Sequence, residues 1–193
     1  MIQATFKTSP ARILDFDIET RAAGYADPAW VPDDVTCYAW SWIGSGKVQG
    51  TVAGPDACFG PYEKQREWLR PLRDLLCEAD VVTGHNILRF DLRVVNANFM
   101  RFGLDPLPPL RVQDTMRLPK TKGFKKGQDN IGELLELPLH KLALNHQQWD
   151  QAYREPGWPT VLERCVSDVE QHVLIREAML ERGWLGEPRV WRP

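Results

Sequence analysis

The sequence predicts an α/β fold in which helices pack on a mixed β-sheet. Two observations support this prediction. The first quarter of the chain contains three strand-like segments joined by turn residues, and the rest alternates between strand-like and helix-like segments. Hairpin strands followed by βα units give antiparallel and parallel neighbours in one layered architecture.

The elements follow in order along the chain. The three opening strands are expected at residues 12–18, 35–44 and 47–54, with a turn at Gly44-Ser45-Gly46. Apolar residues at helical spacing predict a helix from Tyr62 to Glu78 and a closing helix from Thr160 to Arg182. Between these helices we expect strands at 81–86 and 111–116, and helices through Val94 to Phe99 and over 129–137. The segments are closely spaced, which indicates one domain over residues 1–193.

Composition indicates a folded globular chain without a general attraction to nucleic acid. The 193 residues are 43% hydrophobic and 26% charged, with a formal net charge of -2. A polyanionic partner would therefore need a local basic surface or bound cations.

The cysteines and the N-terminal segment predict a cytoplasmic protein. Cys37, Cys58, Cys77 and Cys165 are widely separated and have no zinc-binding spacing, so we expect reduced thiols. The sequence has neither the pattern of a signal peptide nor a membrane-spanning apolar stretch, so no membrane partner is expected.

Carboxylates share one face of the first strand. Alternation places Asp15, Asp17 and Glu19 on one side of DFDIET and the apolar residues on the other. Carboxylates this close repel one another unless a cation lies among them, and a hard divalent cation prefers oxygen ligands. The alternative is a solvated face of an amphipathic strand.

A further carboxylate interrupts the apolar stripe of the closing helix. Asp168 lies at helical spacing between Cys165 and His172, where an unpaired charge would be costly to bury. It is therefore either a metal ligand or the partner of Arg164, one turn earlier in the helix.

Together with GHNILRFDL around Asp91, these segments resemble the DEDD (DnaQ-like) superfamily of 3′→5′ exonucleases, which has an RNase H-like fold. DFDIET is similar to the first motif of this family, GHNILRFDL to the second and RCVSDVE to the third. The resemblance extends from about residue 12 to about residue 176. It implies a five-stranded mixed sheet with three antiparallel strands first and helices on both faces.

The resemblance also implies an activity and a set of site residues. Asp17, Glu19, Asp91 and Asp168 would hold two divalent cations, Mg²⁺ or Mn²⁺, and the enzyme would release 5′-nucleotides from a free 3′ end by a two-metal mechanism. The substrate would be single-stranded or 3′-ended DNA or RNA. Residues expected to contact it are Thr20, His85, Asn86, Phe90 and Arg164.

The third motif departs from the family pattern. The family has a Tyr four residues, or a His five residues, before the last Asp, and this chain has Arg164 and Glu163 there. Arginine stays protonated, so it is not a general base but is able to hold a phosphate. Glu163 is therefore the candidate for water activation. Its alternative role is a helix capping box with Thr160.

Residues 111–128 form the densest basic stretch, and we expect Lys122, Lys125 and Lys126 to hold the substrate strand. Solvated positive charge is the alternative explanation for this stretch. Two further functions remain open: a nucleic-acid-binding module that has lost catalysis, and an RNase H-like endonuclease. Retention of all four acids disfavours the first, and the Asn86-to-Asp91 pattern disfavours the second.

Overall fold

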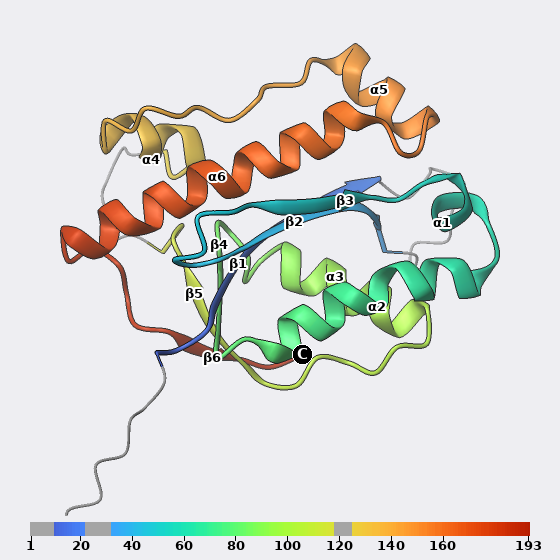
Figure 1. Ribbon diagram of the computed structural model, residues 1–193, viewed down its shortest axis with the longest axis horizontal. Coiled ribbons are helices and arrows are strands. Elements are labelled where there is room, and N and C mark those ends of the chain that lie inside the picture. Colours follow the sequence, from blue (N-terminus) through green and yellow to red (C-terminus); the bar gives the residue numbers. More distant parts are fainter. Residues whose placement is uncertain (1–9, 22–31, 118–124) are drawn as a thin grey trace, which may run out of the picture.

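A computed structural model describes residues 10–21, 32–117 and 125–193. The described residues form a six-stranded sheet in the order β3-β2-β1-β4-β5-β6 (Figure 1). The strands are β1 Ile13–Arg21, β2 Asp34–Trp42, β3 Gln49–Val52, β4 Val81–Gly84, β5 Leu110–Asp114 and β6 Arg189–Trp191. The predicted mixed α/β architecture is confirmed.

The directions of the strands follow from how they are connected. β1, β2 and β3 are antiparallel neighbours, whereas β4 and β5 run parallel to β1 after helical crossovers. The expected count of five strands is wrong, because β6 adds an antiparallel edge beside β5. With only three residues, β6 is too short to show an alternating pattern in the sequence.

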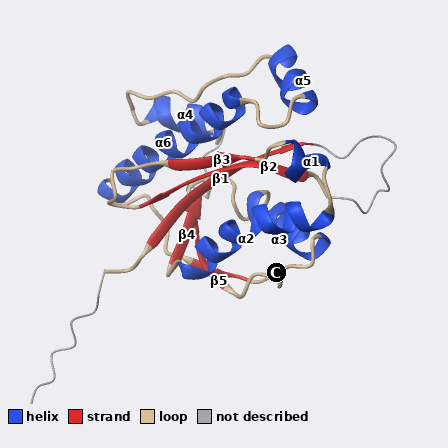
Figure 2. Cartoon of the chain, turned by 45° about the vertical axis from the view of Figure 1, so that its right-hand side comes forward, coloured by secondary structure: helices blue, strands red, loops and turns tan. Residues whose placement is uncertain are grey.

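Helices cover both faces of the sheet, as Figures 1 and 2 show. The packed pair α2 (Tyr62–Glu78) and α3 (Asp91–Arg101) lies on one face, and α6 (Pro159–Glu181) crosses β1, β2 and β3 on the other. The remaining helices are shorter: α1 Pro55–Phe59, α4 Gln128–Leu134 and α5 His146–Arg154. None of the helices in the described parts of the chain is both long and apolar enough to cross a bilayer.

The main hydrophobic core lies between the sheet and the α2–α3 pair. Leu14, Phe16 and Ile18 of β1 are buried there against a cluster that includes Leu72 and Phe99. Burial of each large apolar side chain contributes about 1.5–3 kcal/mol. Because these residues of β1 face the core, the residues between them, which include the carboxylates, face α6.

Candidate metal centre

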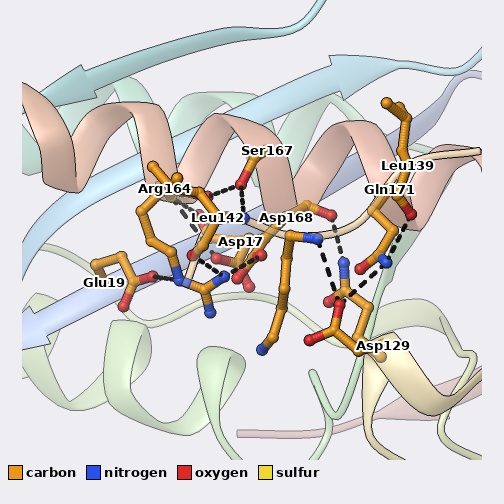
Figure 3. A network of polar contacts seen from close by, with 12 residues as sticks. Asp17, Glu19, Asp129, Leu139, Leu142, Arg164, Ser167, Asp168 and Gln171 are labelled. Atoms are coloured by element: carbon orange, nitrogen blue, oxygen red, sulfur yellow. Dashed lines mark hydrogen bonds and ion pairs between the residues drawn. The ribbon is translucent and has the colours of Figure 1, made fainter. Parts of the chain in front are cut away.

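Three of the four predicted acids come together between β1 and α6 (Figure 3). Asp17, Glu19 and Asp168 each place a carboxylate oxygen within 4.8 Å of the other two. Asp168 is buried, while Asp17 and Glu19 are partly exposed. An oxygen-only donor set of this size suits Mg²⁺ or Mn²⁺, so the residues present fit the implied metal.

The residues of β1 and α6 lie opposite one another because the contacting segments of the two elements have similar lengths. Along β1, Asp15 contacts His172, Asp17 contacts Cys165 and Glu19 contacts Arg164, so β1 and α6 run in opposite directions. Eight residues of helix from 164 to 172 rise about 12 Å, and four residues of strand from 15 to 19 rise about 13 Å. The two end contacts, at Asp15 and Glu19, are therefore matched in length, and Asp17 between them contacts Cys165, one residue from Arg164.

Burial and mutual repulsion raise the pKa values of the acids. The pKa of Asp17 lies well above its ordinary value because of burial first, and then because of the charges of Asp91, Asp168 and Glu19. Burial is also the main reason that the pKa of Glu19 rises to about 7 and that of Asp168 to about 6. Near neutral pH these acids therefore bind more protons than ordinary carboxylates do, unless a cation is bound.

Arg164 supplies positive charge at the position that carries Tyr in the resembled family (Figure 3). Its Nη1 lies 2.7 Å from Oδ1 of Asp168, and its Nε lies 3.5 Å from Oε1 of Glu19. The guanidinium also donates a hydrogen bond to the carbonyl of Leu142. The sequence alternative, an ion pair within the helix, is thus present, and it engages two of the three clustered carboxylates.

Asp91 approaches the same group from the N-terminus of α3. Its carboxylate lies outside the 4.8 Å group but close enough to raise the pKa of Asp17. The pKa of Asp91 rises to about 7 through burial, and hydrogen bonds from the backbone N–H groups of Asp91 and Ile18 oppose this rise. Because β4 pairs with β1 only as far as Asp15, the Ile18 N–H is free to hold Asp91 beside the other acids.

The turn that presents Asp91 is fixed by a carboxylate that does not belong to the acid cluster. Asp114 accepts hydrogen bonds from the backbone N–H groups of Asn86, Leu88 and Met116. Asn86 has a positive φ of 62°, which asparagine tolerates better than most residues. Gly84 precedes this turn, and a Cβ there would lie 2.9 Å from the carbonyl oxygen of Phe16.

His85 belongs to a series of polar contacts that ends at Asp15. Its Nε2 lies 2.9 Å from the carbonyl of Lys126 and its Nδ1 lies 3.1 Å from Oγ1 of Thr115. Thr115 Oγ1 lies 2.7 Å from Nε2 of His172, whose Nδ1 lies 2.5 Å from Oδ2 of Asp15. Both ring nitrogens of His85, predicted to bind substrate, are therefore already engaged.

The donors and acceptors in this series of contacts determine where its protons lie. Burial lowers the pKa of His85 to about 4, so its ring is neutral, and its Nε2 must donate because it faces a carbonyl. Thr115 then donates to His85 and accepts from His172. One further proton is shared between His172 and Asp15, so this buried pair has no net charge. Asp15 shares the strand face of Asp17 and Glu19, but it is paired with His172.

The other predicted residues are distributed around the cluster. Phe90 is exposed on the turn before α3, and Thr20 follows a β-bulge that comes directly after Glu19. The side chain of Lys125 is exposed and that of Lys126 is partly buried. Lys122 lies outside the described residues.

Glu163 is exposed, and at 100° per residue it lies about 140° around α6 from Asp168. It makes no ion pair or hydrogen bond with any residue of the described chain. The capping-box interpretation is wrong, because α6 begins at Pro159, with Trp158 as N-cap and no side-chain cap. The Thr160 hydroxyl therefore does not have the position that a cap requires.

One contribution to the site was missed in the sequence. The charge of Lys141 lowers the pKa values of Glu19 and Asp168, so a second cation lies near the acids. Its backbone N–H donates to Asp129, which also accepts from Gln171 of α6. Lys141 belongs to an irregular segment, and no local pattern would have identified it.

Comparisons with known proteins support the fold. No family model matches the chain, and no curated protein matches it. Among solved structures, the chain is similar to the family B DNA polymerase from the hyperthermophilic archaeon Pyrobaculum calidifontis, with a TM-score of 0.56 and 18% identity. The match covers 89% of this chain and 25% of the polymerase chain, so the chain spans about a quarter of that protein. At this identity the likeness concerns the fold.

Proposed function

We propose that this chain is a metal-dependent 3′→5′ exonuclease that hydrolyses phosphodiester bonds at nucleic-acid 3′ ends. The observation that carries the proposal is the convergence of Asp17, Glu19 and Asp168 within 4.8 Å, with Asp91 beside them. Without a cation, repulsion among these carboxylates destabilises the folded protein. The arrangement therefore supports a role in cation binding. The fold shared with a DNA polymerase agrees with a nucleic-acid substrate.

The four acids would hold two Mg²⁺ or Mn²⁺ ions, with Asp17 shared between them. When bound, such a pair supplies Lewis acidity for water attack and for departure of the 3′ oxygen. Among the chain's own groups, Phe90 would stack on a terminal base, a role that its exposure supports. The Arg164 guanidinium is suited to holding a phosphate oxygen once its carboxylate partners bind the cations.

One observation favours a second candidate, a nucleic-acid-binding module without catalysis. Arg164 already neutralises Glu19 and Asp168 in part, so part of the repulsion among the acids is relieved without a metal. Binding of Mn²⁺ would have to displace these ion pairs. The two candidates differ in whether a bound strand is shortened.

The test is digestion of matched DNA and RNA oligonucleotides labelled at the 5′ end, with Mn²⁺, with Mg²⁺ and with a chelator. An exonuclease gives a ladder of products that shorten from the 3′ end only when metal is present. Internal cuts would indicate an endonuclease, and an intact strand that still shifts in a binding assay would indicate the binding module. The DNA and RNA arms identify the preferred substrate.

A further inference from the structure

A basic groove lies at the sheet edge formed by β6. It has a volume of about 500 Å³ and is lined by residues of α3, of the turn before α3, of the segment that follows β5 and of the segment around β6. Four arginines line it, Arg93, Arg117, Arg189 and Arg192, together with Trp191 and Leu88. No Asp or Glu is among the described residues that line this groove.

The four arginines are exposed, and their guanidinium groups make no ion pair or hydrogen bond with other described residues. Some arginines elsewhere in the described chain are paired, although Arg66 and Arg70 of α2 are not. Arg21 and Arg101 both pair with Asp34, and Arg164 pairs with Asp168. The groove therefore concentrates unneutralised charge in a protein whose formal net charge is -2.

The groove is continuous with the turn that presents Asp91. Leu88 lines the groove and lies three residues before Asp91, so their Cα atoms are at most about 11 Å apart at 3.8 Å per residue. Arg93 follows Asp91 by two residues in α3 and is exposed on the groove side. A short stretch of chain therefore joins the groove to the acids.

We propose that this groove binds the phosphodiester backbone of a nucleic-acid strand, upstream of the 3′ end held at the acids. Guanidinium groups bind phosphates with paired hydrogen bonds, and four unpaired guanidiniums in one groove complement the regular charge of such a strand. The partly buried Trp191 adds an aromatic side chain to the lining, a type of group that contacts bases. The assignment of the 3′ end to the acids rests on the proposed function, whereas binding in the groove does not.

The experiment compares Arg189→Ala/Arg192→Ala with a charge-matched control, Arg66→Ala/Arg70→Ala. The control arginines are exposed on α2, outside the groove, and form no ion pair with described residues. Fluorescence anisotropy with a chelator present measures binding of labelled oligonucleotides of about 4 and about 20 nucleotides, which bracket a typical single-strand site. Melting temperatures establish that each variant is folded.

We expect the groove variant to bind the long oligonucleotide about tenfold more weakly, and its salt slope to fall by about 1.4, since each lost single-strand phosphate contact removes about 0.7. The control variant should match the wild type. Equal losses in the groove and control variants would overturn the proposal. So would equal competition by poly-glutamate of the same total charge, because it would show recognition of negative charge alone.

Hydrolysis of the short oligonucleotide with Mn²⁺ separates this proposal from the proposed function. If the wild type hydrolyses it and the groove variant still binds the long strand normally, the groove proposal fails and the function stands. If the wild type hydrolyses neither oligonucleotide but binds the long one, and the groove variant does not bind it, the proposed function fails and the groove proposal stands.

Discussion

Arg164 and Asp168 form an ion pair across one turn of α6, with Nη1 of the arginine 2.7 Å from Oδ1 of the aspartate. The same guanidinium lies 3.5 Å from Glu19. Two carboxylates assigned to a cation are therefore partly neutralised by a side chain of the protein. A metal ion bound by these acids would have to compete with this arginine.

Replacing Arg164 should strengthen metal binding. In Arg164→Met the side-chain length is nearly kept, while the competing charge is lost and two carboxylates are released, so we expect Mn²⁺ to bind about tenfold more tightly. The metal-free melting temperature should fall, because repulsion among the acids is no longer offset. Titration calorimetry measures the affinity. Arg101→Met, which breaks a pair with Asp34 away from the acids, is the control and should leave Mn²⁺ affinity unchanged. Unchanged or weaker Mn²⁺ binding in Arg164→Met would contradict the competition.

Asp17→Asn should abolish hydrolysis without unfolding the protein. The substitution removes the carboxylate assigned to both cations, for which we expect a loss of at least about 10³-fold in rate. The metal-free protein should melt at a higher temperature, because a buried and repelled carboxylate becomes neutral. Asp74→Asn, at an exposed position of α2, is the matched control. Activity within about tenfold of wild type would remove the metal assignment.

Glu163→Gln should leave activity unchanged. The exposed side chain lies about 140° around α6 from Asp168, so it is poorly placed to activate a water at the acids. The measurement is the rate at saturating Mn²⁺, with the melting temperature followed in parallel. A loss of about 10²-fold or more in a folded variant would restore the sequence-based role of Glu163 as a base.

The metal-free protein should lose stability as the pH rises. Folding raises the pKa values of Glu19 and Asp91 to about 7 and that of Asp168 to about 6, above ordinary values near 4. Between about pH 4 and about pH 7 the folded state then binds more protons than the unfolded chain, so the free energy of unfolding falls as the pH rises. His85, with a pKa of about 4, acts in the opposite direction, but it is one group against three.

Melting temperatures at about pH 5 and about pH 8, with chelator or with Mn²⁺, measure this effect. Added Mn²⁺ should stabilise more at the higher pH, where its ligands have lost their protons. A chelated protein that is more stable at the higher pH would contradict the assignment of raised pKa values.

Thr115→Val should destabilise the fold more than Thr83→Val. Thr115 links His85 and His172 and is fully buried, so its loss leaves two ring nitrogens without partners and costs about 2–4 kcal/mol. Thr83 is equally buried but donates a single hydrogen bond, to the carbonyl of Gln113, and its loss should cost about 1–2 kcal/mol. Chemical denaturation measures both changes. Equal losses of unfolding free energy in the two variants would show that the Thr115 contacts with His85 and His172 contribute no more than a single hydrogen bond.

Local patterns predicted the long elements well. The expected helix from Tyr62 to Glu78 has the bounds of α2, and the apolar stripe interrupted by Asp168 is buried along α6. Both rest on several turns of periodicity, which tertiary context did not override. Helix α5 was missed although Asn145 and Gln148 form a capping box at its start, a signal that its sequence contains.

Pairings between distant residues could not be predicted in the same way. Asp15 and Asp17 have the same local pattern, yet Asp15 pairs with His172 and Asp17 joins the acid group. The difference arises from which residue of α6 lies opposite each, and this depends on the packing of two elements about 150 residues apart in the chain. The sequence shows which residues could pair, but not which residue of α6 lies opposite each residue of β1.

The brevity of β6 has a consequence for association between molecules. A sheet edge presents unpaired N–H and C=O groups that a strand of another chain can join, and long flat edges promote aggregation. Here the edge strands β3 and β6 have only four and three residues, and β6 covers the five-residue β5. Loss of pairing by residues 189–191 would expose β5, so solubility depends on a segment that contributes little to the core.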